Sequence, residues 1–528
     1  MTDTDRSSTP GATDEHGPGY ARRWWVLATM TVCLLVVIMG NTILNVALPT
    51  LQRELGATHG ELQWVVDAYI LVFAGLLFSW GVIGDRIGRK RVLLIGLSIF
   101  AIGSVFAAVS DSPIELIAWR AVMGVGGAAV QPTTLAVITN VFPPRERGRA
   151  IGVWAGTAGI AVAGGPLAGG LVLQHFWWGA VFLIGVPVAV LGVGAVLAFV
   201  PESRDPSPGR LDVPGVLLSI VALAGLVYGI IRGGSGAGWT TPGVLVPLLG
   251  GIILLGLFVW LQARSTHPAL DVSLFRNPAF SAAAGALGLN FFALLGATFY
   301  LVYYLQGVLG FTPLQSGAAL IPVALGMAVM APRSSGLAER FGAKAVCATG
   351  FVLIALSFVG VQLLGLSTQV WLLVLILSVQ GIGMGMVMAP ATESIMSVVP
   401  REKAGAGAAV NNSVRQVGGA LGVAILGSVL AASYSARLGA AVDALPAGAR
   451  SEASQSIVGT LEAVRQAQAG GNPEAARAAA DLVDPAREAF VSAMHLTAVF
   501  TAAAALIAAA VVLTWLPGRP KRVSSVTE

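Results

Sequence analysis

Fourteen long apolar runs, separated by short polar segments, constrain this 528-residue chain more than any other feature of its sequence. A helix needs roughly 20 apolar residues to cross a bilayer, and lipid forces each spanning segment to satisfy its own backbone hydrogen bonds. Only 11% of the residues are charged, whereas soluble domains carry about 25%. The sequence therefore predicts an all-α membrane protein with fourteen transmembrane helices, at residues 24–48, 63–83, 92–110, 114–138, 149–173, 177–200, 213–232, 243–263, 279–305, 315–333, 344–365, 370–398, 406–433 and 490–516.

The basic residues predict the orientation of the chain. Most of the 31 Lys and Arg fall in alternate connecting segments, beginning with the N-terminal one. Cytoplasmic loops carry an excess of Lys and Arg, so we expect both termini in the cytoplasm and a multi-pass protein of the cell (inner) membrane. These residues lie between apolar runs and not on one soluble face, so the net charge of +5 does not indicate a nucleic-acid partner.

Two segments of the sequence occur twice. GVIGDRIGRKRV (81–92) returns as SSGLAERFGAKAV (334–346), and GVGGAAVQPTTLAVITNVFPPRER (124–147) returns as GIGMGMVMAPATESIMSVVPREK (381–403). The repeat places a six-helix unit on each side of an inserted helix pair. Duplicated six-helix halves with a binding site at their interface are typical of transporters.

This repeat predicts five regions. We expect a disordered cytoplasmic tail at 1–22, an N-terminal six-helix bundle at 23–200, and a linker with two extra transmembrane helices at 201–278. A C-terminal six-helix bundle follows at 279–516, and a cytoplasmic tail at 517–528. The C-terminal bundle includes a long external loop, 434–489, which is either one or two amphipathic helices or a flexible spacer.

Several motifs in these runs resemble the major facilitator superfamily, and within it the fourteen-helix drug:proton antiporters. They are GVIGDRIGRKRV, LIAWRAVMGVGGAAV, GGPLAGG, FWWGAVFLIGVP and AVNNSVRQVGGALGVAILGS, and the match covers nearly all of residues 23–516. The resemblance implies a major facilitator fold, with two six-helix bundles and two extra helices between them. It also implies proton-coupled export of apolar, often cationic, drugs or toxic compounds by alternating access.

Two of the motifs imply conformational roles. GDRIGRKR resembles the superfamily's motif A, and the resemblance implies a latch between the halves in the outward-facing state, formed by Gly81, Asp85, Arg86, Gly88, Arg89, Glu339 and Arg340. GIAVAGGPLAGGLV resembles the antiporter motif, with Gly152, Gly165, Pro166, Gly169 and Gly170, although Ala161 stands where the family has another glycine. The alternatives are a purely topogenic charge cluster and ordinary small-residue packing.

A third motif brings a charge into the membrane and lacks its usual partner. Arg120 resembles the motif B arginine, which needs a partner because it cannot lose its charge. Helix 1 of the family usually carries an acid where this chain has Gly40. We expect Asp67, at the outer end of the second run, to be the charge partner of Arg120 in place of the missing helix 1 acid. There are two alternatives. Asp67 lies in the first turn of its helix in contact with external water, or Arg120 extends its side chain to the membrane surface.

The second half of the chain holds the other expected coupling residues. Glu393 is expected to lie inside the membrane, where a desolvated acid can exchange protons, and Arg415 to partner it; a cytoplasmic helix-end cluster is the alternative. Polar residues expected in the cavity are Asn41, Asn45, Asn411 and Gln416. A preference for cations is expected from aromatic faces, at Phe291, Phe292, Phe299, Tyr300, Tyr303 and Tyr304.

Other classes of function find no support in the sequence. GVGGAA and GIGMG lie inside apolar runs and not after a strand, so they do not predict a nucleotide site, and no His/Cys cluster or nucleophile–base pair is visible. We expect no enzyme activity, no metal and no cofactor other than the proton gradient. The expected partners are small-molecule substrates, protons and the bilayer, with no nucleic acid, and the resemblance implies a monomer. A dedicated exporter of one metabolite or antibiotic and a non-transporting membrane sensor stay open as alternatives.

Overall fold

The computed structural model describes residues 20–204, 212–265, 270–399, 404–445, 450, 453–469, 473–516 and 518. Within these residues the secondary structure is helical, without a strand. Of the two predicted tails, only Tyr20–Arg22, a single 3₁₀ turn, and residue 518 belong to the described part.

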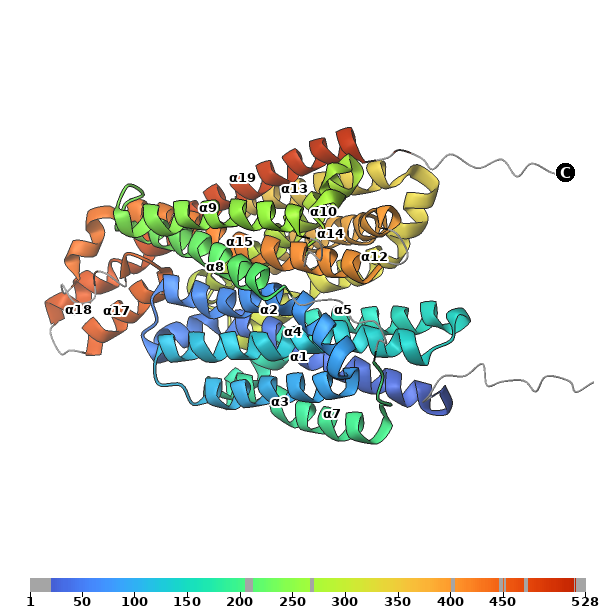
Figure 1. Ribbon diagram of the computed structural model, residues 1–528. Helices are drawn as coiled ribbons and strands as arrows, with labels where there is room; N and C mark the ends of the chain where they lie inside the picture. The colour runs from blue at the N-terminus through green and yellow to red at the C-terminus, as the bar shows by residue number, and fades with distance from the viewer. Residues whose placement is uncertain are drawn as a thin grey trace, which may run out of the picture.

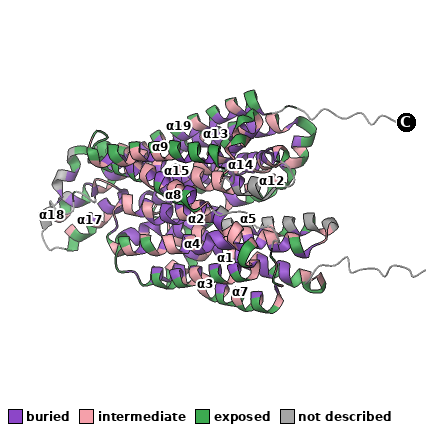
Figure 2. Cartoon of the chain, viewed as in Figure 1, coloured by how far each residue is buried: buried purple, intermediate pink, exposed green. Residues whose placement is uncertain are grey.

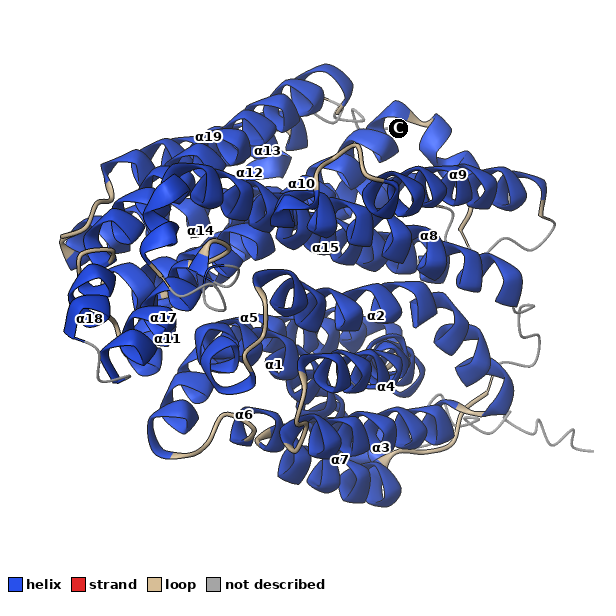
Figure 3. Cartoon of the chain, turned by 90° about the vertical axis from the view of Figure 1, so that its left-hand side faces the viewer, coloured by secondary structure: helices blue, strands red, loops and turns tan. Residues whose placement is uncertain are grey.

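The first half of the molecule contains the six predicted spans. Its helices are α1 (Arg23–Leu55), α2 (His59–Ile87), α3 (Arg89–Ala108), α4 (Pro113–Val141), α5 (Pro144–His175), and the broken sixth span α6 (Ala180–Leu183) and α7 (Gly185–Phe199). The inserted pair follows as α8 (Val213–Arg232) and α9 (Pro242–Arg264). In Figures 1 and 3, α1 to α7 form one group, and α8 and α9 lie with the second half.

The second half contains six spans and a long loop. Its spanning helices are α10 (Pro278–Tyr303), α11 (Pro313–Ala319) with α12 (Ile321–Phe341), α13 (Ala343–Gly360), α14 (Val370–Val398), α15 (Ala404–Leu438) and α19 (Val483–Trp515). The loop carries α17 (Ile457–Ala469) and α18 (Pro473–Ala480).

The predicted number of spans agrees with the structure. Thirteen stretches among the described residues are long and apolar enough to cross a membrane. The fourteenth, α5, is 32 residues long and packs along α1. The outer faces are apolar, with Leu191 71% and Ile253 68% exposed, and Figure 2 shows the buried residues gathered between the helices. Large exposed apolar surfaces are unfavourable in water, so this surface fits lipid.

Polar residues at the run boundaries begin the helices. Thr58 accepts the amide of Glu61, and the Glu61 side chain accepts the Thr58 amide in return, which starts α2. Thr312 and Gln315 make the same reciprocal pair before α11. A capping box of this kind satisfies amides that have no partner inside the helix. The spans therefore begin where the apolar runs meet such residues.

The internal repeat is visible in the geometry of the two halves. Gly88 after α2 and Gly342 after α12 both have positive φ, 115° and 90°, a conformation that favours glycine. Gly96 and Gly126 bring α3 and α4 into backbone contact, and Gly350 and Gly383 do the same for α13 and α14. The repeated sequence thus encodes repeated turns and repeated helix contacts.

The long loop is folded in its described residues. Gln52 Nε2 of α1 donates to Ser456 Oγ at 2.5 Å, and Tyr434 and Thr460 share a hydrogen bond of 2.6 Å. Ile457 is fully buried. The expectation of amphipathic helices is confirmed, and the flexible-spacer alternative is wrong for these residues.

The two faces of the bundle are distinguished by what lies at them. The start of α1 and the end of α19 lie at one face, here called the termini side, and α17 and α18 lie at the opposite one, called the loop side (Figure 1). An even number of spans requires this arrangement.

Candidate functional site

A cavity lies between the two halves, near the middle of the spanning helices. It holds roughly 1170 Å³ of empty space, and its polar lining residues are Asn41, Thr42, Asn45, Gln131, Thr298, Gln380, Asn412, Arg415 and Gln416. Tyr69, Phe73 and Phe291 add aromatic faces. Among the described residues that line it, Arg415 is the one charged side chain, and no acid is present.

Three of the four polar residues predicted for the cavity line it. Asn41, Asn45 and Gln416 do so, but Asn411 is 7% exposed and is not a lining residue. Its neighbour Asn412 takes the place, because consecutive helical residues point about 100° apart. Gln131, Gln380 and Thr298 were missed, although a single polar residue inside an apolar run is a usable signal.

The halves meet closely on the loop side of the cavity. A Cβ built on Gly170 of α5 would lie 2.6 Å from Leu314 Cα, and one on Gly317 would be in equally close contact with Pro166. Gln63 Nε2 of α2 donates to the Val423 carbonyl of α15 at 3.0 Å. Backbone contact of this kind leaves no path for a solute.

On the termini side of the cavity the contact is thinner. Gln131 Nε2 of α4 donates to Asn412 Oδ1 of α15 at 3.4 Å. Such a long hydrogen bond is weak. The described residues therefore hold the two halves together more firmly on the loop side of the cavity than on the termini side.

The antiporter motif forms part of the firm closure. Gly165 and Gly169 of α5 pack against Thr42 and Ile43 of α1, while Pro166 and Gly170 contact α11 of the second half. Thr42 Oγ1 donates to the Ala161 carbonyl at 3.1 Å, so the departure at Ala161 is tolerated. Gly152 lies in α5 outside the described side-chain positions.

Arg120 is buried and bonded to neutral acceptors only. Its Nε donates to Val65 O at 3.0 Å, and its two terminal nitrogens donate to Gly40 O at 3.3 Å and Asn41 Oδ1 at 3.2 Å. The guanidinium carbon also lies 4.4 Å from the centroid of the Tyr69 ring. The side chain is 0% exposed, so the snorkelling alternative is wrong.

The expectation that Asp67 is the charge partner of Arg120 is wrong. Asp67 is fully buried, and neither of its carboxylate oxygens has a hydrogen-bond partner. Arg120 contacts α2 through Val65 and Tyr69, and successive helical residues turn by about 100°, so Asp67 points away from it. Full burial also rules out the alternative of an acid wet from outside.

Asp67 instead lies between the faces of α2 that meet α15 and α8. Gln63, one turn earlier, bonds to α15. Trp64 lies 6.3 Å, centroid to centroid, from Tyr228 of α8. Residues three and four apart share a helix face, which places Asp67 at the junction of the first half, the inserted pair and the second half.

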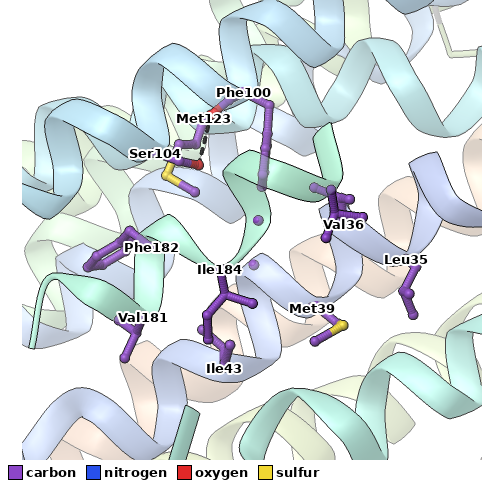
Figure 4. Close-up of a pocket in the computed structure, with 13 residues that line it drawn as sticks. Leu35, Val36, Met39, Ile43, Phe100, Ser104, Met123, Val181, Phe182 and Ile184 are labelled. Carbon is purple, nitrogen blue, oxygen red and sulfur yellow. Dashed lines mark hydrogen bonds between the residues drawn. The ribbon is translucent and has the colours of Figure 1, made fainter. Parts of the chain in front are cut away.

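The position of the missing acid is filled by an aromatic ring. A Cβ on Gly40 would lie 2.7 Å from Cζ of Phe100 in α3. Gly40 borders an apolar pocket inside the first half, which Figure 4 shows with Phe100, Met39 and Ile184 around it. The ring fills the space that an acidic side chain would take, and the carbonyl of Gly40 serves Arg120 instead.

Glu393 and Arg415 do not form the expected pair. Glu393 of α14 is exposed, whereas Arg415 of α15 faces the cavity with its guanidinium carbon 4.4 Å from the Phe291 ring centroid. In the described part of the chain no carboxylate lies within salt-bridge distance of Arg415. The expected pairing is wrong, whereas the placing of Glu393 inside the membrane stays a prediction, since α14 is one of the candidate membrane spans.

Asp85 and Arg89 of the predicted latch contact their own half here. Arg89 Nη2 pairs with Asp85 Oδ1 at 2.9 Å, and its backbone amide donates to Ser203 O at 3.0 Å. Glu339 and Arg340 are exposed. A Cβ on Gly81 would meet nothing within 4 Å, so this glycine is not in close contact with another helix. The latch role stays a prediction for another conformation.

Most of the aromatic residues expected to bind cations lie elsewhere. Of the six, Phe291 lines the cavity. Phe299 and Tyr303 surround His59 on the loop side, and Tyr304 bonds to Gly365 and Thr368. The aromatic argument for cationic substrates therefore rests on one of the six rings.

Comparison with known proteins identifies the relatives of this chain. The profile of the Major Facilitator Superfamily matches residues 30–423. The tetracenomycin C resistance and export protein of Streptomyces glaucescens is 33% identical over 500 residues, 93% of this chain and 91% of that protein. The multidrug efflux pump LfrA of Mycolicibacterium smegmatis is 35% identical over 494 residues, 93% of this chain and 96% of that protein.

A solved structure shares the fold. It is a bacterial homolog of the human lysosomal transporter Spinster, in an inward-facing, unoccupied conformation. The TM-score is 0.64 at 16% sequence identity, with 95% of this chain and 99% of that chain covered.

Proposed function

This chain belongs to the Major Facilitator Superfamily, and from that premise we propose that it exports drug-like or toxic apolar compounds across the cytoplasmic membrane in exchange for protons. Relatives that match over nearly their whole length are named for drug resistance and efflux. Transporters of this kind bind small molecules and reside in the bilayer as multi-pass proteins. We further propose that the termini side is cytoplasmic, as the positive-inside rule favours, and that the protein acts as a monomer.

The observation that carries the transport mechanism is the unequal closure of the cavity. The halves meet in backbone contact on the loop side at Gly170 and Gly317, whereas the weak Gln131–Asn412 bond joins them toward the termini side. Rocking of the two halves about the cavity opens it to one side at a time. A substrate from the cytoplasm or the inner leaflet enters on the weak side and leaves when the loop side separates.

Asp67 is the residue proposed to couple this motion to protons. Among the described residues it is the one buried carboxylate. A buried, unpaired carboxylate is costly as an ion, by several kcal/mol, so the loop-side closure favours its neutral form. Separation of α2 from α15 brings Asp67 to external water, where it ionises or takes up a proton according to pH. Return to the closed form then buries the protonated acid, and exchange is complete when Asp67 releases this proton toward the termini side before the next substrate is exported.

Reconstituted protein tests this proposal. In proteoliposomes with an imposed pH gradient, we expect the wild type to exchange tetracenomycin C for protons. Asp67→Asn keeps the buried shape but cannot release a proton, so we expect the pH dependence of transport to disappear. Glu393→Gln is the matched control, because Glu393 is exposed, and it is expected to keep wild-type coupling.

Two outcomes would contradict the proposal. Wild-type coupling in Asp67→Asn removes that residue from the proton path. Absence of transport and of substrate-driven proton release with every compound tried contradicts export and favours a membrane sensor. Resistance to a single compound in a pump-deficient host would instead establish the dedicated exporter, the second candidate, which the tetracenomycin-related relative favours.

A further inference from the structure

We propose that the cavity selects aromatic compounds that carry a negative charge, such as a carboxylate or phenolate, and that Arg415 is their counter-charge. This inference rests on the proposed function and names the substrate class of the same site. It differs from the cationic class that the sequence suggests. The argument begins with the surroundings of Arg415.

The guanidinium of Arg415 is open to the cavity and has no acceptor. Its ring contact with Phe291 covers one face, but in the described part of the chain none of its N–H groups donates a hydrogen bond and no carboxylate is within reach. Arg presents up to five donors in a planar fork that matches a carboxylate. The guanidinium of Arg415 is therefore available to donate hydrogen bonds to an acceptor on the ligand.

Arg120 adds a second positive charge behind the cavity wall. Its three hydrogen bonds end on neutral oxygens, so no nearby carboxylate cancels it. Because arginine is a donor only, Asn41 must turn its oxygen to Arg120. Its amide N–H₂ is then left for the cavity that Asn41 lines. The site thus offers further hydrogen-bond donors, and its described lining residues include no carboxylate to bind a cation.

The walls strengthen this bias. Asp67, the one buried acid among the described residues, lies on another face of α2 and does not line the cavity. Charges of one sign in a cleft with low-dielectric walls focus the field and concentrate ligands of the opposite sign. Tyr69, Phe73 and Phe291 supply ring faces for an aromatic body. An aromatic anion satisfies both the rings and the guanidinium.

The charge of the substrate has a consequence for energetics. When one monovalent anion leaves and one proton enters, the net charge moved inward is +2. The membrane potential therefore drives this exchange in addition to the pH gradient. Exchange of a monovalent cation for one proton moves no net charge. The response to membrane potential therefore reports the charge of the exported species.

Three matched fluorophores test the selectivity. Purified protein is titrated with anthracene-9-carboxylate, its uncharged methyl ester and 9-(aminomethyl)anthracene, which share one ring system. We expect the carboxylate to bind at least ten-fold more tightly than the amine. Arg415→Gln should remove this preference and leave the affinity for the ester within about two-fold, whereas Arg415→Lys should retain part of it.

Arg437→Gln is the control, because Arg437 lies on the same helix but bonds to Ser433 outside the cavity. It is expected to bind all three compounds as the wild type does, and binding of the ester reports that each variant is folded. In proteoliposomes without a pH gradient, a potential negative on the cytoplasmic side should accelerate carboxylate export.

Several results would overturn the inference. They are amine binding as tight as carboxylate binding, an unchanged preference in Arg415→Gln, or potential-independent export of the carboxylate. pH-driven export of the amine alone would refute the anionic class and leave the proposed function standing. Carboxylate binding without transport of any of the three would refute export and leave the binding preference intact.

Discussion

A side chain at position 40 is expected to be destabilising, and the structure gives the reason. A Cβ there would lie 2.7 Å from Phe100 Cζ, well inside the roughly 3.5–4.0 Å of an ordinary carbon contact. The clashing atom is the tip of the ring, so the Phe100 side chain must turn away, while its backbone is held where α3 and α4 approach closely at Gly96 and Gly126. Overpacking of this kind costs about 1–3 kcal/mol, which is the expected loss for Gly40→Ala.

The loss should depend on the ring. Phe100→Leu leaves a small void but removes the clashing atom, so Gly40→Ala should cost little in that background. Residues in direct contact show coupling energies of about 0.5–3 kcal/mol. Between the substitutions at positions 40 and 100 we expect a coupling energy of about 1–2 kcal/mol. Gly40→Asp, which restores the family's acid, meets the same obstruction and should need the same second substitution.

The assay is the free energy of unfolding in mixed detergent and SDS micelles, for the two single variants and the double variant. Gly81→Ala is the control: a Cβ there meets nothing, and alanine inside a helix is favoured over glycine by about 0.5–1 kcal/mol. It should therefore stabilise. A neutral Gly40→Ala, or effects at positions 40 and 100 that add within about 0.5 kcal/mol, would refute the packing argument.

Two further predictions concern the arginine and the closure. Arg120→Lys keeps the charge but has one nitrogen for three separated acceptors. Hydrogen bonds to charged groups contribute about 1.5–3 kcal/mol each, so we expect lower thermal stability and loss of transport, and retained wild-type transport would contradict it. Gly170→Val places a side chain against Leu314 and should keep the loop side from closing. A cysteine introduced at Asn45 should then react faster with an external thiol reagent than in the otherwise wild-type protein, and an unchanged rate would contradict the assignment of this contact as the gate.

The spans and the repeat were within reach of the sequence. Runs of apolar residues long enough to cross a bilayer, ended by capping residues such as Thr58 and Thr312, locate helices because both signals are local. The repeated glycines likewise predicted repeated geometry, and Gly88 and Gly342 adopt the same kind of backbone turn.

The partners of the buried charges could not be predicted from the sequence. Depth along a helix can be counted from the sequence, and by depth Asp67 and Arg120 are close. Their directions differ, because Val65 and Tyr69 occupy the face toward α4 and Asp67 the face toward α15 and α8. Pairing charges by their depth along the helices alone therefore joined Asp67 to Arg120, although helix packing separates these two side chains.

By itself the sequence determined that this chain crosses the membrane about fourteen times in two related halves, since hydropathy and repetition are properties of the chain. Only the tertiary structure decided that Arg120 is held by carbonyls and an amide, that Phe100 takes the place of an acid, and that Arg415 faces an acid-free cavity. The physical reason is that electrostatic partners are set by contacts over a few ångströms between helices distant in sequence. Those contacts follow from how the helix faces pack.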